Sequence, residues 1–507
     1  MTWGELHAAL RDRGLLAPGS GSDAGSDAFA RTPVTGAAYD SRHVQPGDVF
    51  VALRGQRADG STFVPEAIRR GAVAVIAQEE GPSTPGVAWA QVTNGRLALA
   101  VIAVALHHDP SQRMLVVGIT GTNGKTTTAH LMASIFEAAG VRCGLLGTVA
   151  YRIGNQTRPA TRTTPEAPDV QALLAEMVAK GCGACAMEVS SHALALGRVE
   201  GMHFGAAVFT NLTRDHLDFH SDMEDYFQAK RHLFELLPRD RPAIINADDP
   251  RATTLIDTVG RPITYGISRP ADVSPTPLSY SLKGLTFQAK TPRGTLDLQS
   301  ALVGRPNVYN ILAAVATAVA LDIPGDAIET GIAALDRVPG RFQLVSSPGD
   351  DVNVVVDYAH TDDALKNLLE TARPLAARRI ITVFGCGGDR DRTKRPLMGA
   401  VAGRLSDIIL ITSDNPRSED PARIIEEIQR GITPDTRRNT EQSTIAVVDR
   451  RQAIERAIDM AGSGDLVLVA GKGHEKYQSI GDQTLPFDDV EVARTALSRR
   501  RSRQGVR

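Results

Sequence analysis

A short glycine-containing segment offers the chemistry of a phosphate-binding loop. Gly121-Thr122-Asn123-Gly124-Lys125-Thr126 joins an apolar run to a stretch with helical spacing. Glycines let backbone N–H groups surround phosphates at the positive end of the following helix. The Lys125 ammonium would neutralise the terminal phosphates, and the Thr126 hydroxyl would bind Mg²⁺. Ile119 stands where the general phosphate-loop pattern places its first glycine. We nevertheless expect this segment to bind a nucleotide.

Two further polar clusters follow apolar, strand-like runs. Glu188-Val-Ser-Ser-His192 comes after one such run, and Asn211-Leu-Thr-Arg-Asp-His216 comes after the next. In open parallel sheets, ligands bind outside the carboxyl ends of the strands. We therefore expect both clusters to meet the phosphate loop at one site, with Glu188 as an oxygen ligand of Mg²⁺.

Lys230 stands four residues after Tyr226 and four before Phe234. This spacing predicts that the three side chains share one helix face. A lysine at such a position is usually a solvated side chain, and that interpretation stays open here.

These residues need several α/β units to position them. At roughly 150 residues per domain, the 507 residues suggest three domains. Strand-like runs alternate with amphipathic helical stretches, which indicates parallel sheets with crossover helices. We predict an α/β protein with an N-terminal α/β domain at 1–110, a central phosphate-loop ATPase domain with a parallel sheet at 111–338, and a Rossmann-like C-terminal domain at 339–507.

Composition excludes several other classes of protein. The net charge of −2 gives no bulk attraction to nucleic acid or to an anionic membrane. The N-terminus does not resemble a secretion signal, and no apolar run is long enough to span a membrane. The four cysteines do not form a disulfide framework, and Cys182 and Cys185 are expected to be buried thiols. We expect a cytoplasmic protein, with a mobile Gly/Ser/Asp-rich loop at 17–30 and a solvated arginine-rich tail from Ser498.

Motifs along nearly the whole chain resemble those of the Mur ligases, which build the peptide of the bacterial cell wall. The phosphate loop in its Thr-Gly-Thr-Asn-Gly-Lys-Thr form is one of them. The others that carry the resemblance are Asp40-Ser-Arg42, Thr163-Thr-Pro165, Glu188-Val-Ser-Ser-His192, Asn211-Leu-Thr-Arg-Asp-His216, Tyr226-Phe-Gln-Ala-Lys230, Gly340-Arg-Phe342, Asp357-Tyr-Ala-His360, Gly385-Cys-Gly-Gly-Asp-Arg390, Asp414-Asn-Pro-Arg417 and Gly471-Lys-Gly-His-Glu475.

The resemblance implies a reaction and its cofactors. Family members of this type use ATP and Mg²⁺ to add an amino acid to UDP-N-acetylmuramoyl-L-alanyl-D-glutamate through an acyl phosphate. We expect small-molecule partners, without nucleic acid or membrane insertion. The oligomeric state stays open, with a monomer favoured. Three alternatives stay open: the same ligase using L-lysine, a ligase similar to folylpolyglutamate synthetase, and an ATP-binding switch or scaffold without ligase activity.

The resemblance also implies roles for individual residues. The catalytic residues would be Lys125, Glu188, His216 and Lys230. The metal ligands would be Thr126, Glu188, His216 and Lys230, the last as a carbamylated lysine (N6-carboxylysine). The ATP-binding residues would be Gly121, Thr122, Asn123, Gly124, Lys125, Thr126, Thr127, Asn307, Asn310, Arg341, Asp357, Tyr358 and His360. The residues for the UDP-muramoyl peptide would be Ser41, Thr163, Thr164, Ser190 and Arg198.

One motif suggests which amino acid is added. Asp414-Asn-Pro-Arg417 resembles the form of the motif that selects meso-diaminopimelate, whose distal carboxylate L-lysine lacks. The Arg417 guanidinium could hold that carboxylate through two charge-assisted hydrogen bonds. The implied diaminopimelate-binding residues are Arg390, Asp414, Asn415, Pro416, Arg417, Gly471 and Glu475.

Overall fold

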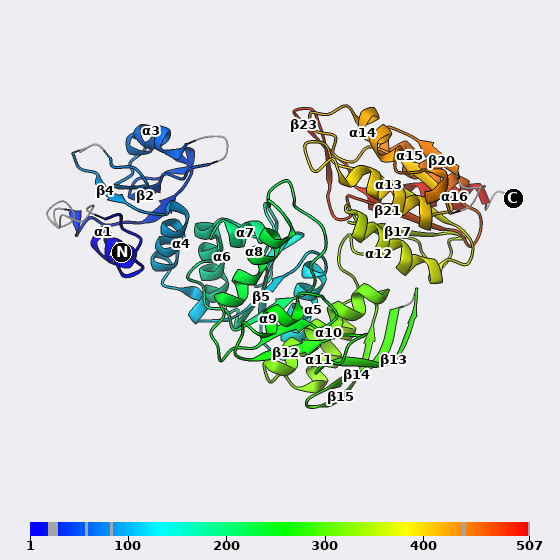
Figure 1. Ribbon diagram of the computed structural model, residues 1–507, viewed down its shortest axis with the longest axis horizontal. Coiled ribbons are helices and arrows are strands. Elements are labelled where there is room, and N and C mark those ends of the chain that lie inside the picture. The colour runs from blue at the N-terminus through cyan, green and yellow to red at the C-terminus, as the bar shows by residue number, and fades with distance from the viewer. Residues whose placement is uncertain (19–28, 56–58, 82–84, 283, 439–442, 505–507) are drawn as a thin grey trace.

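The computed structural model describes residues 1–18, 29–55, 59–81, 85–282, 284–438 and 443–504. Figure 1 shows three bodies that follow one another along the chain, each built around its own sheet. The predicted α/β fold with parallel sheets is confirmed.

The first body has a four-stranded parallel sheet in the order β1-β2-β3-β4. Its core includes Trp3, Leu6 and Leu10, which recur on one face of α1 and are fully buried. The elements are α1 Trp3–Asp12, β1 Gly36–Ala38, η1 Ser41–His43, β2 Asp48–Val51, η2 Gly60–Phe63, α3 Val64–Arg69, β3 Ala74–Ala77, β4 Ala88–Gln91, α4 Gly95–Leu106 and η3 Pro110–Gln112.

The central body contains an eight-stranded sheet in the order β12-β11-β10-β5-β9-β6-β7-β8. Neighbouring strands are parallel from β12 to β6, whereas β7 and β8 are added at one edge in antiparallel pairing. Its elements are β5 Leu115–Thr120, α5 Lys125–Ala138, β6 Cys143–Leu146, β7 Ala150–Ile153, β8 Gln156–Pro159, α6 Ala167–Ala179, β9 Ala184–Glu188, α7 Ser191–Ala195, β10 Ala206–Phe209, α8 Met223–Glu235, β11 Ala243–Asn246, α9 Ala252–Ile256 and β12 Pro262–Tyr265.

Two features of this body position the phosphate loop. Strand β5 lies between β9 and β10. The phosphate loop and the two other predicted polar clusters therefore follow the carboxyl ends of three neighbouring strands. Helix α5 buries Leu131, Met132, Ile135 and Phe136, as their spacing predicts, and the chain turns at Gly140 with φ +77°.

A small antiparallel sheet follows and was not expected in a block predicted to be parallel. Strands β13 Ser274–Ser281, β14 Gly284–Thr291 and β15 Gly294–Ser300 form a meander. The helices α10 Arg305–Ala320 and α11 Gly325–Ala334 complete this body. Helix α10 begins at Arg305, so Asn307 and Asn310 lie within its first turns.

The third body is built on a six-stranded sheet in the order β16-β17-β21-β18-β19-β20, parallel except for β16. Its elements are β16 Gln343–Leu344, β17 Asn353–Asp357, α12 Asp362–Ala372, η4 Arg373–Leu375, β18 Ile380–Phe384, α13 Lys394–Leu405, β19 Ile408–Ile411, α14 Pro421–Gln429, η5 Pro434–Thr436, β20 Ser443–Ala446, α15 Arg450–Met460, β21 Leu466–Ala470, a hairpin of β22 Tyr477–Ile480 and β23 Gln483–Pro486, and α16 Asp489–Gln504.

The arginine-rich tail is not the loose solvated end that the sequence suggested. It forms the last turns of α16, where Arg500 pairs with Asp351 at 2.7 Å and Arg501 pairs with Asp350 at 2.6 Å. Most of the predicted loop at 17–30 lies outside the described residues. All four cysteines are buried and free, in agreement with the prediction.

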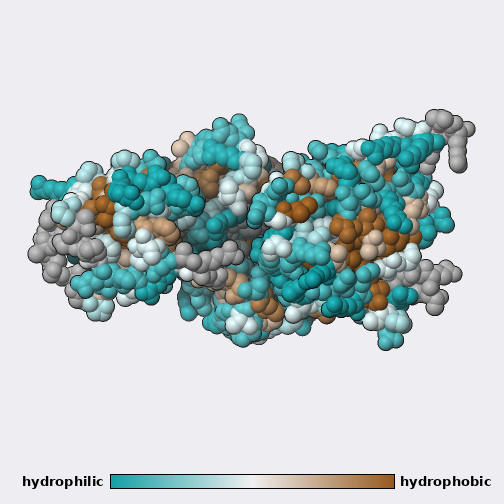
Figure 2. Space-filling model, turned by 90° about the horizontal axis from the view of Figure 1, so that it is seen from above, coloured by the Kyte–Doolittle hydropathy of each residue, from teal (hydrophilic) through white to brown (hydrophobic). Residues whose placement is uncertain are grey.

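The described helices include none with the length and apolar character needed to cross a bilayer. The face in Figure 2 is largely hydrophilic with scattered apolar patches.

Candidate active site

A cavity of about 250 Å³ lies where the second and third bodies meet. The residues predicted to bind ATP line it from both sides, apart from Gly121. Those contributed by the second body are Thr122, Asn123, Gly124, Lys125, Thr126, Thr127, Asn307 and Asn310, and those contributed by the third are Arg341, Asp357, Tyr358 and His360. The structure thus brings together polar groups that are more than two hundred residues apart in the sequence.

The phosphate loop adopts a conformation that requires glycine. Gly121 has φ +142° and Gly124 has φ +88°. A Cβ atom at Gly124 would lie 2.3 Å from the Asn310 Oδ1 atom, so the loop approaches α10 too closely for a side chain. The Lys125 Nζ atom donates to the carbonyl oxygens of Gly121 at 2.8 Å and Thr122 at 2.9 Å. Burial lowers the pKa of Lys125.

Glu188 is held at the end of β9 by two threonines. Its Oε2 atom accepts from the Thr126 hydroxyl at 3.0 Å and from the Thr148 hydroxyl at 3.1 Å. Its Oε1 atom accepts from the Thr148 backbone N–H at 2.7 Å. Sequence reasoning missed Thr148, although it follows β6 at the same edge of the sheet and could have been found by extending the strand-end argument to that strand.

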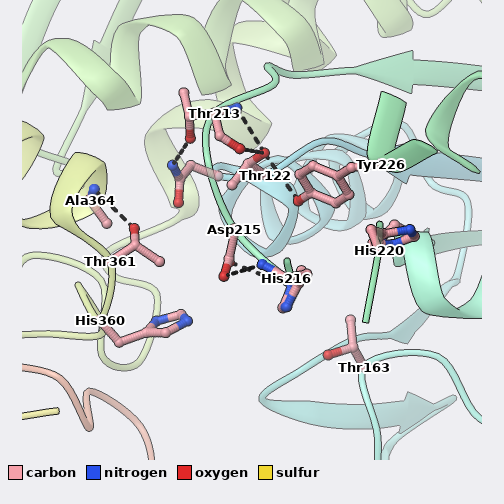
Figure 3. A network of polar contacts seen from close by, with 12 residues as sticks. Thr122, Thr163, Thr213, Asp215, His216, His220, Tyr226, His360, Thr361 and Ala364 are labelled. Atoms are coloured by element: carbon pink, nitrogen blue, oxygen red, sulfur yellow. Dashed lines mark hydrogen bonds and ion pairs between the residues drawn. The ribbon is translucent and has the colours of Figure 1, made fainter. Parts of the chain in front are cut away.

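The loop after β10 presents Asp215 and His216 to the cavity (Figure 3). His216 has a left-handed backbone with φ +55°, and its Nε2 atom lies 3.5 Å from Asp215 Oδ2. Burial lowers the pKa of His216 to about 3, although the Asp215 carboxylate opposes the shift. The imidazole is therefore neutral near pH 7 and has a nitrogen lone pair free for a ligand. In Figure 3, His360 of the third body lies on the opposite side of Asp215 from Tyr226.

Lys230 is buried on α8, with only 1% of its surface exposed. The predicted face is confirmed, since Tyr226 and Phe234 are buried beside it. Its Nζ atom lies 4.3 Å from the centroid of the Tyr226 ring, and within the described chain it has neither a hydrogen bond nor an ion pair. Burial, assisted by the charge of Lys125, lowers the pKa of Lys230 well below its ordinary value. Lys230 does not line the cavity, but Tyr226 links its helix to the phosphate loop through a contact of 3.1 Å with the Thr122 hydroxyl.

The predicted metal ligands are only partly assembled. Across the residues that the structure describes, three or more His, Cys, Asp or Glu side chains nowhere gather closely enough to hold a metal ion. Of the four predicted ligands, Thr126 and Glu188 are in direct contact and offer oxygen atoms, which Mg²⁺ prefers. A buried lysine amine is no such ligand, so Lys230 fits the set only if it carries a carboxyl group.

Three of the residues predicted for the UDP-muramoyl peptide lie beside Glu188. Thr163 and Ser190 line the cavity, and the Thr163 hydroxyl lies 3.0 Å from that of Thr148. The buried Thr164 hydroxyl donates to the Glu188 carbonyl oxygen at 2.8 Å. Ser190 caps α7 by accepting from the Ala193 N–H.

The two other residues predicted for this substrate have partners within the chain. The buried Arg198 guanidinium pairs with the Glu166 carboxylate at 2.7 Å and donates to the Thr164 carbonyl oxygen at 3.0 Å. The Ser41 hydroxyl donates to Glu66 at 2.9 Å. Neither residue lines the cavity of 250 Å³.

The residues predicted for diaminopimelate gather on loops after β18, β19 and β21. Asn415 donates to Glu475 at 2.9 Å, and the fully buried Lys472 donates to both, at 3.0 Å each. Asp414 and Pro416 are buried, as is Gly471, where a Cβ atom would lie 2.5 Å from an Asp414 oxygen. Sequence reasoning did not assign a role to Lys472, because a lysine within a motif gives no sign of burial.

Two arginines complete this group. Arg417 has φ +52°, and its Nη1 atom donates to the Gly388 carbonyl oxygen at 2.7 Å. Arg390 is exposed on the neighbouring loop. None of the predicted diaminopimelate residues lines the cavity of 250 Å³, so they form a second group in the third body.

Comparison with known proteins adds independent evidence. Family models match residues 33–133 (Mur ligase family, catalytic domain), 119–318 (Mur ligase middle domain) and 340–473 (Mur ligase, glutamate ligase domain). The UDP-N-acetylmuramoyl-L-alanyl-D-glutamate–2,6-diaminopimelate ligase of Solibacter usitatus is 47% identical over 98% of both chains. The ligase of the same name from Geobacillus thermodenitrificans is 45% identical over 91% of this chain and 94% of its own.

Solved structures of known ligases also match this chain over most of its length. One, a ligase with the same printed name, matches with a TM-score of 0.67 at 33% identity over 99% of both chains. A MurF ligase of Thermotoga maritima in complex with ADP shares the fold, with a TM-score of 0.62 at 18% identity over 92% of this chain and 99% of its own. The resemblance seen in the sequence motifs is confirmed, and the chain belongs to the Mur ligase family.

Proposed function

We propose that the protein is an ATP-dependent amide ligase that adds meso-diaminopimelate to UDP-N-acetylmuramoyl-L-alanyl-D-glutamate. The observation that carries the proposal is the cavity that the phosphate loop lines together with Arg341, Asp357 and His360 of the third body. Relatives named for this activity, 44–47% identical over at least 90% of the chain, support it. Because both ATP and the UDP-linked precursor are intracellular metabolites, we expect the protein to act in the cytoplasm.

The proposed reaction has two steps. An oxygen of the substrate's glutamate side-chain carboxylate attacks the γ-phosphorus of ATP, and the bond from that phosphorus to the β–γ bridging oxygen breaks, releasing ADP. The amine of diaminopimelate, after losing a proton, attacks the carbonyl carbon of the acyl phosphate. The C–O bond to phosphate then breaks, and an amide and inorganic phosphate remain.

The first step brings the substrate carboxylate against the anionic γ-phosphate, so the site must supply positive charge. Lys125 of the second body and Arg341 of the third both line the cavity and can face the phosphates. Arg341 already donates to the Thr126 hydroxyl at 3.2 Å, across the boundary between the two bodies. Asp357, Asn307 and Asn310 offer hydrogen-bonding groups to the ribose and the base, whereas Tyr358 and His360 border the same space.

Thr126 and Glu188 would hold Mg²⁺, with His216 and a carbamylated Lys230 as further ligands. The metal would contribute positive charge at the phosphates. Carbamylation suits Lys230, because only a neutral amine adds CO₂ and burial favours the neutral form of this lysine. The product would be an anionic oxygen ligand on a helix that Tyr226 ties to the phosphate loop.

The UDP-muramoyl peptide would bind where the first and second bodies meet. Thr163, Thr164 and Ser190 lie beside Glu188 and can hold the peptide end near the reacting phosphate. Ser41 and Arg198 would have to exchange their present partners, Glu66 and Glu166, for substrate.

Selection of the amino acid would depend on Arg417. Its guanidinium would pair with the distal carboxylate of diaminopimelate, while Asp414, Asn415 and Glu475 hold the ammonium group at the same end. L-lysine would leave the arginine without its anion. A missing partner of this kind costs about 3–5 kcal/mol when buried, which predicts at least about a hundredfold preference for diaminopimelate.

Paired kinetics test the proposal. ADP release is measured with and without the UDP-muramoyl dipeptide, and kcat/KM is then compared for diaminopimelate and L-lysine in the wild type and Arg417→Ala, with the exposed Arg456→Ala as control. We expect release that requires the dipeptide, and a preference for diaminopimelate that only Arg417→Ala loses. Equal efficiency with lysine would favour the alternative ligase, activity on a folate substrate would favour the synthetase, and release independent of any acceptor would favour a nucleotide switch.

A further inference from the structure

One loop of the second body, residues 211–216, touches the third body through Arg214. The phosphate-loop side chain Asn123 donates to Asp363 on α12 at 3.1 Å and to the Thr213 hydroxyl at 3.3 Å. Arg214, the next residue, donates to the Thr393 hydroxyl and lies 3.6 Å from the Asp391 carboxylate. Asp215 and His216, which border the nucleotide cavity, follow directly.

Asp391, the partner of Arg214, lies on a loop of the third body that also carries a predicted amino-acid residue. Asp391 comes directly after Arg390, on the loop between β18 and α13. Its Oδ1 atom accepts from the Thr393 N–H at 2.8 Å and so fixes the start of α13. The first residue of that helix, Lys394, donates to the His360 carbonyl oxygen at 2.9 Å, beside the nucleotide cavity. The contact of Arg214 therefore joins the loop that carries His216 to the loop that carries Arg390.

We propose that Arg214 is a positioning residue, which couples the amino-acid loop of the third body to the phosphate site through Asp391 and Thr393. The two loops belong to different bodies, so the contact can form only when the bodies are as close as in this structure. Arg214 lines no part of the cavity and does not touch the predicted amino-acid residues, so its effect is indirect. The inference rests on the proposed function for the identity of the amino acid, but not for the contact itself.

A double-mutant cycle tests the coupling. The variants are Arg214→Met, Asp391→Asn and the double variant. The asparagine oxygen can still accept from the Thr393 N–H, so the start of α13 is kept. We expect each single change to lower kcat/KM for the amino acid at least fivefold, and the double variant to be no worse than the poorer single. Arg214→Lys should recover part of the loss, while KM for ATP should change less than threefold in all variants.

The ion pair between Arg251 and Glu224 provides the control. It lies within the second body, with an N–O distance of 2.7 Å and similar or greater exposure of both side chains. The Arg251→Met and Glu224→Gln changes should alter kcat/KM less than twofold. Losses that add in the Arg214–Asp391 cycle, or that equal those of the control pair, would overturn the proposal.

A second measurement separates this inference from the proposed function. Fluorescent labels on the second and third bodies report their separation by energy transfer, with and without a non-hydrolysable ATP analogue. We expect the analogue to bring the labels together in the wild type and the control variants, but less completely in Arg214→Met. The same closure in Arg214→Met as in the wild type would refute the coupling. If the wild type ligated no amino acid, the proposed function would be wrong. The energy-transfer measurement would still decide whether Arg214 couples the two bodies.

Discussion

At the scale of single residues, Lys230 is the side chain whose environment most constrains its chemistry. It is buried without a carboxylate partner among the described residues, beside the Tyr226 ring. We predict that Lys230→Ala lowers ligase turnover at least about a hundredfold, because a charge near the phosphates is lost. A short-chain carboxylic acid should partly restore turnover, as a replacement for the carbamate. Lys366→Ala, on the exposed face of α12, should have no effect in the same assay. Near-normal turnover of Lys230→Ala would contradict the carbamate.

The same lysine predicts a pH dependence of stability. Its amine titrates near 10.4 in an unfolded chain, whereas burial lowers the pKa well below that value in the folded protein. Between these two values the unfolded state binds the additional proton, so Lys230 destabilises the fold at pH 7, and the penalty shrinks as the pH rises toward 10.4. In CO₂-free buffer, Lys230→Met should have a higher Tm than the wild type at pH 7, with a smaller difference at pH 9. Circular dichroism checks this, and a difference independent of pH would contradict it.

At the scale of elements, the turn from β5 into α5 depends on Gly124 both for its positive φ and for its lack of a Cβ atom. Gly140, which follows the end of α5, provides a comparison. Gly124 and Gly140 both have positive φ, at +88° and +77°, but only Gly124 lacks space for a Cβ atom. Gly140→Ala should therefore lose only the left-handed backbone preference, about 1 kcal/mol, with normal affinity for ATP. Gly124→Ala should be less stable still and should bind ATP at least about tenfold more weakly, because its Cβ atom displaces Asn310. Thermal unfolding and nucleotide titration of both variants check this, and equal effects would contradict it.

The arrangement of elements around the phosphate loop could be predicted from the sequence. Three apolar runs ending in polar residues predict parallel strands with their ends at one edge, and β5, β9 and β10 lie side by side. The antiparallel meander β13–β15 was missed, because its strands interrupt a stretch in which strands and helices otherwise alternate.

Contacts between elements could not be predicted from sequence patterns. The hydrogen bond from Asn123 to Asp363 joins residues 240 positions apart. The pairs of Ser41 with Glu66 and Arg198 with Glu166 satisfy side chains that motif matching had assigned to substrate. Such pairings depend on how helices and loops pack in three dimensions, and residue type and spacing do not determine that packing.

At the scale of the whole molecule, the cavity proposed for ATP lies between the second and third bodies, whereas the loops proposed for the amino acid belong to the third body alone. The first and second bodies meet where α4 packs on α6 (Figure 1). There the Tyr39 hydroxyl donates to Asp169 at 2.9 Å. The second and third bodies are joined around the cavity by Arg341, Asp363 and Arg214. A ligase that joins three substrates requires such an arrangement, because each substrate must enter before the reacting groups can meet.

One carboxylate, that of Glu166, concentrates charge at the boundary of the first and second bodies. It lies 2.7 Å from Arg198, 3.0 Å from Arg162 and 3.8 Å from Arg96, which α4 contributes. The buried Arg198 Nε atom has no hydrogen-bond partner within the described chain, so its charge depends heavily on this carboxylate. Glu166→Gln would leave three cations around a neutral amide. We predict that it destabilises the protein by roughly 1–3 kcal/mol and raises KM for the UDP-linked substrate more than KM for ATP, because the arginines border the residues beside Glu188.

The matched control is Glu176→Gln on α6, which breaks the more exposed pair with Arg158 at 2.6 Å. A surface pair of this kind contributes at most about 1 kcal/mol. Calorimetry of both variants and the wild type, at low and at high salt, measures the two effects. The loss in Glu166→Gln should persist at high salt, since burial shields that cluster from counterions, whereas the small effect of Glu176→Gln should vanish. Equal Tm values for the two variants would show that the three arginines do not depend on Glu166.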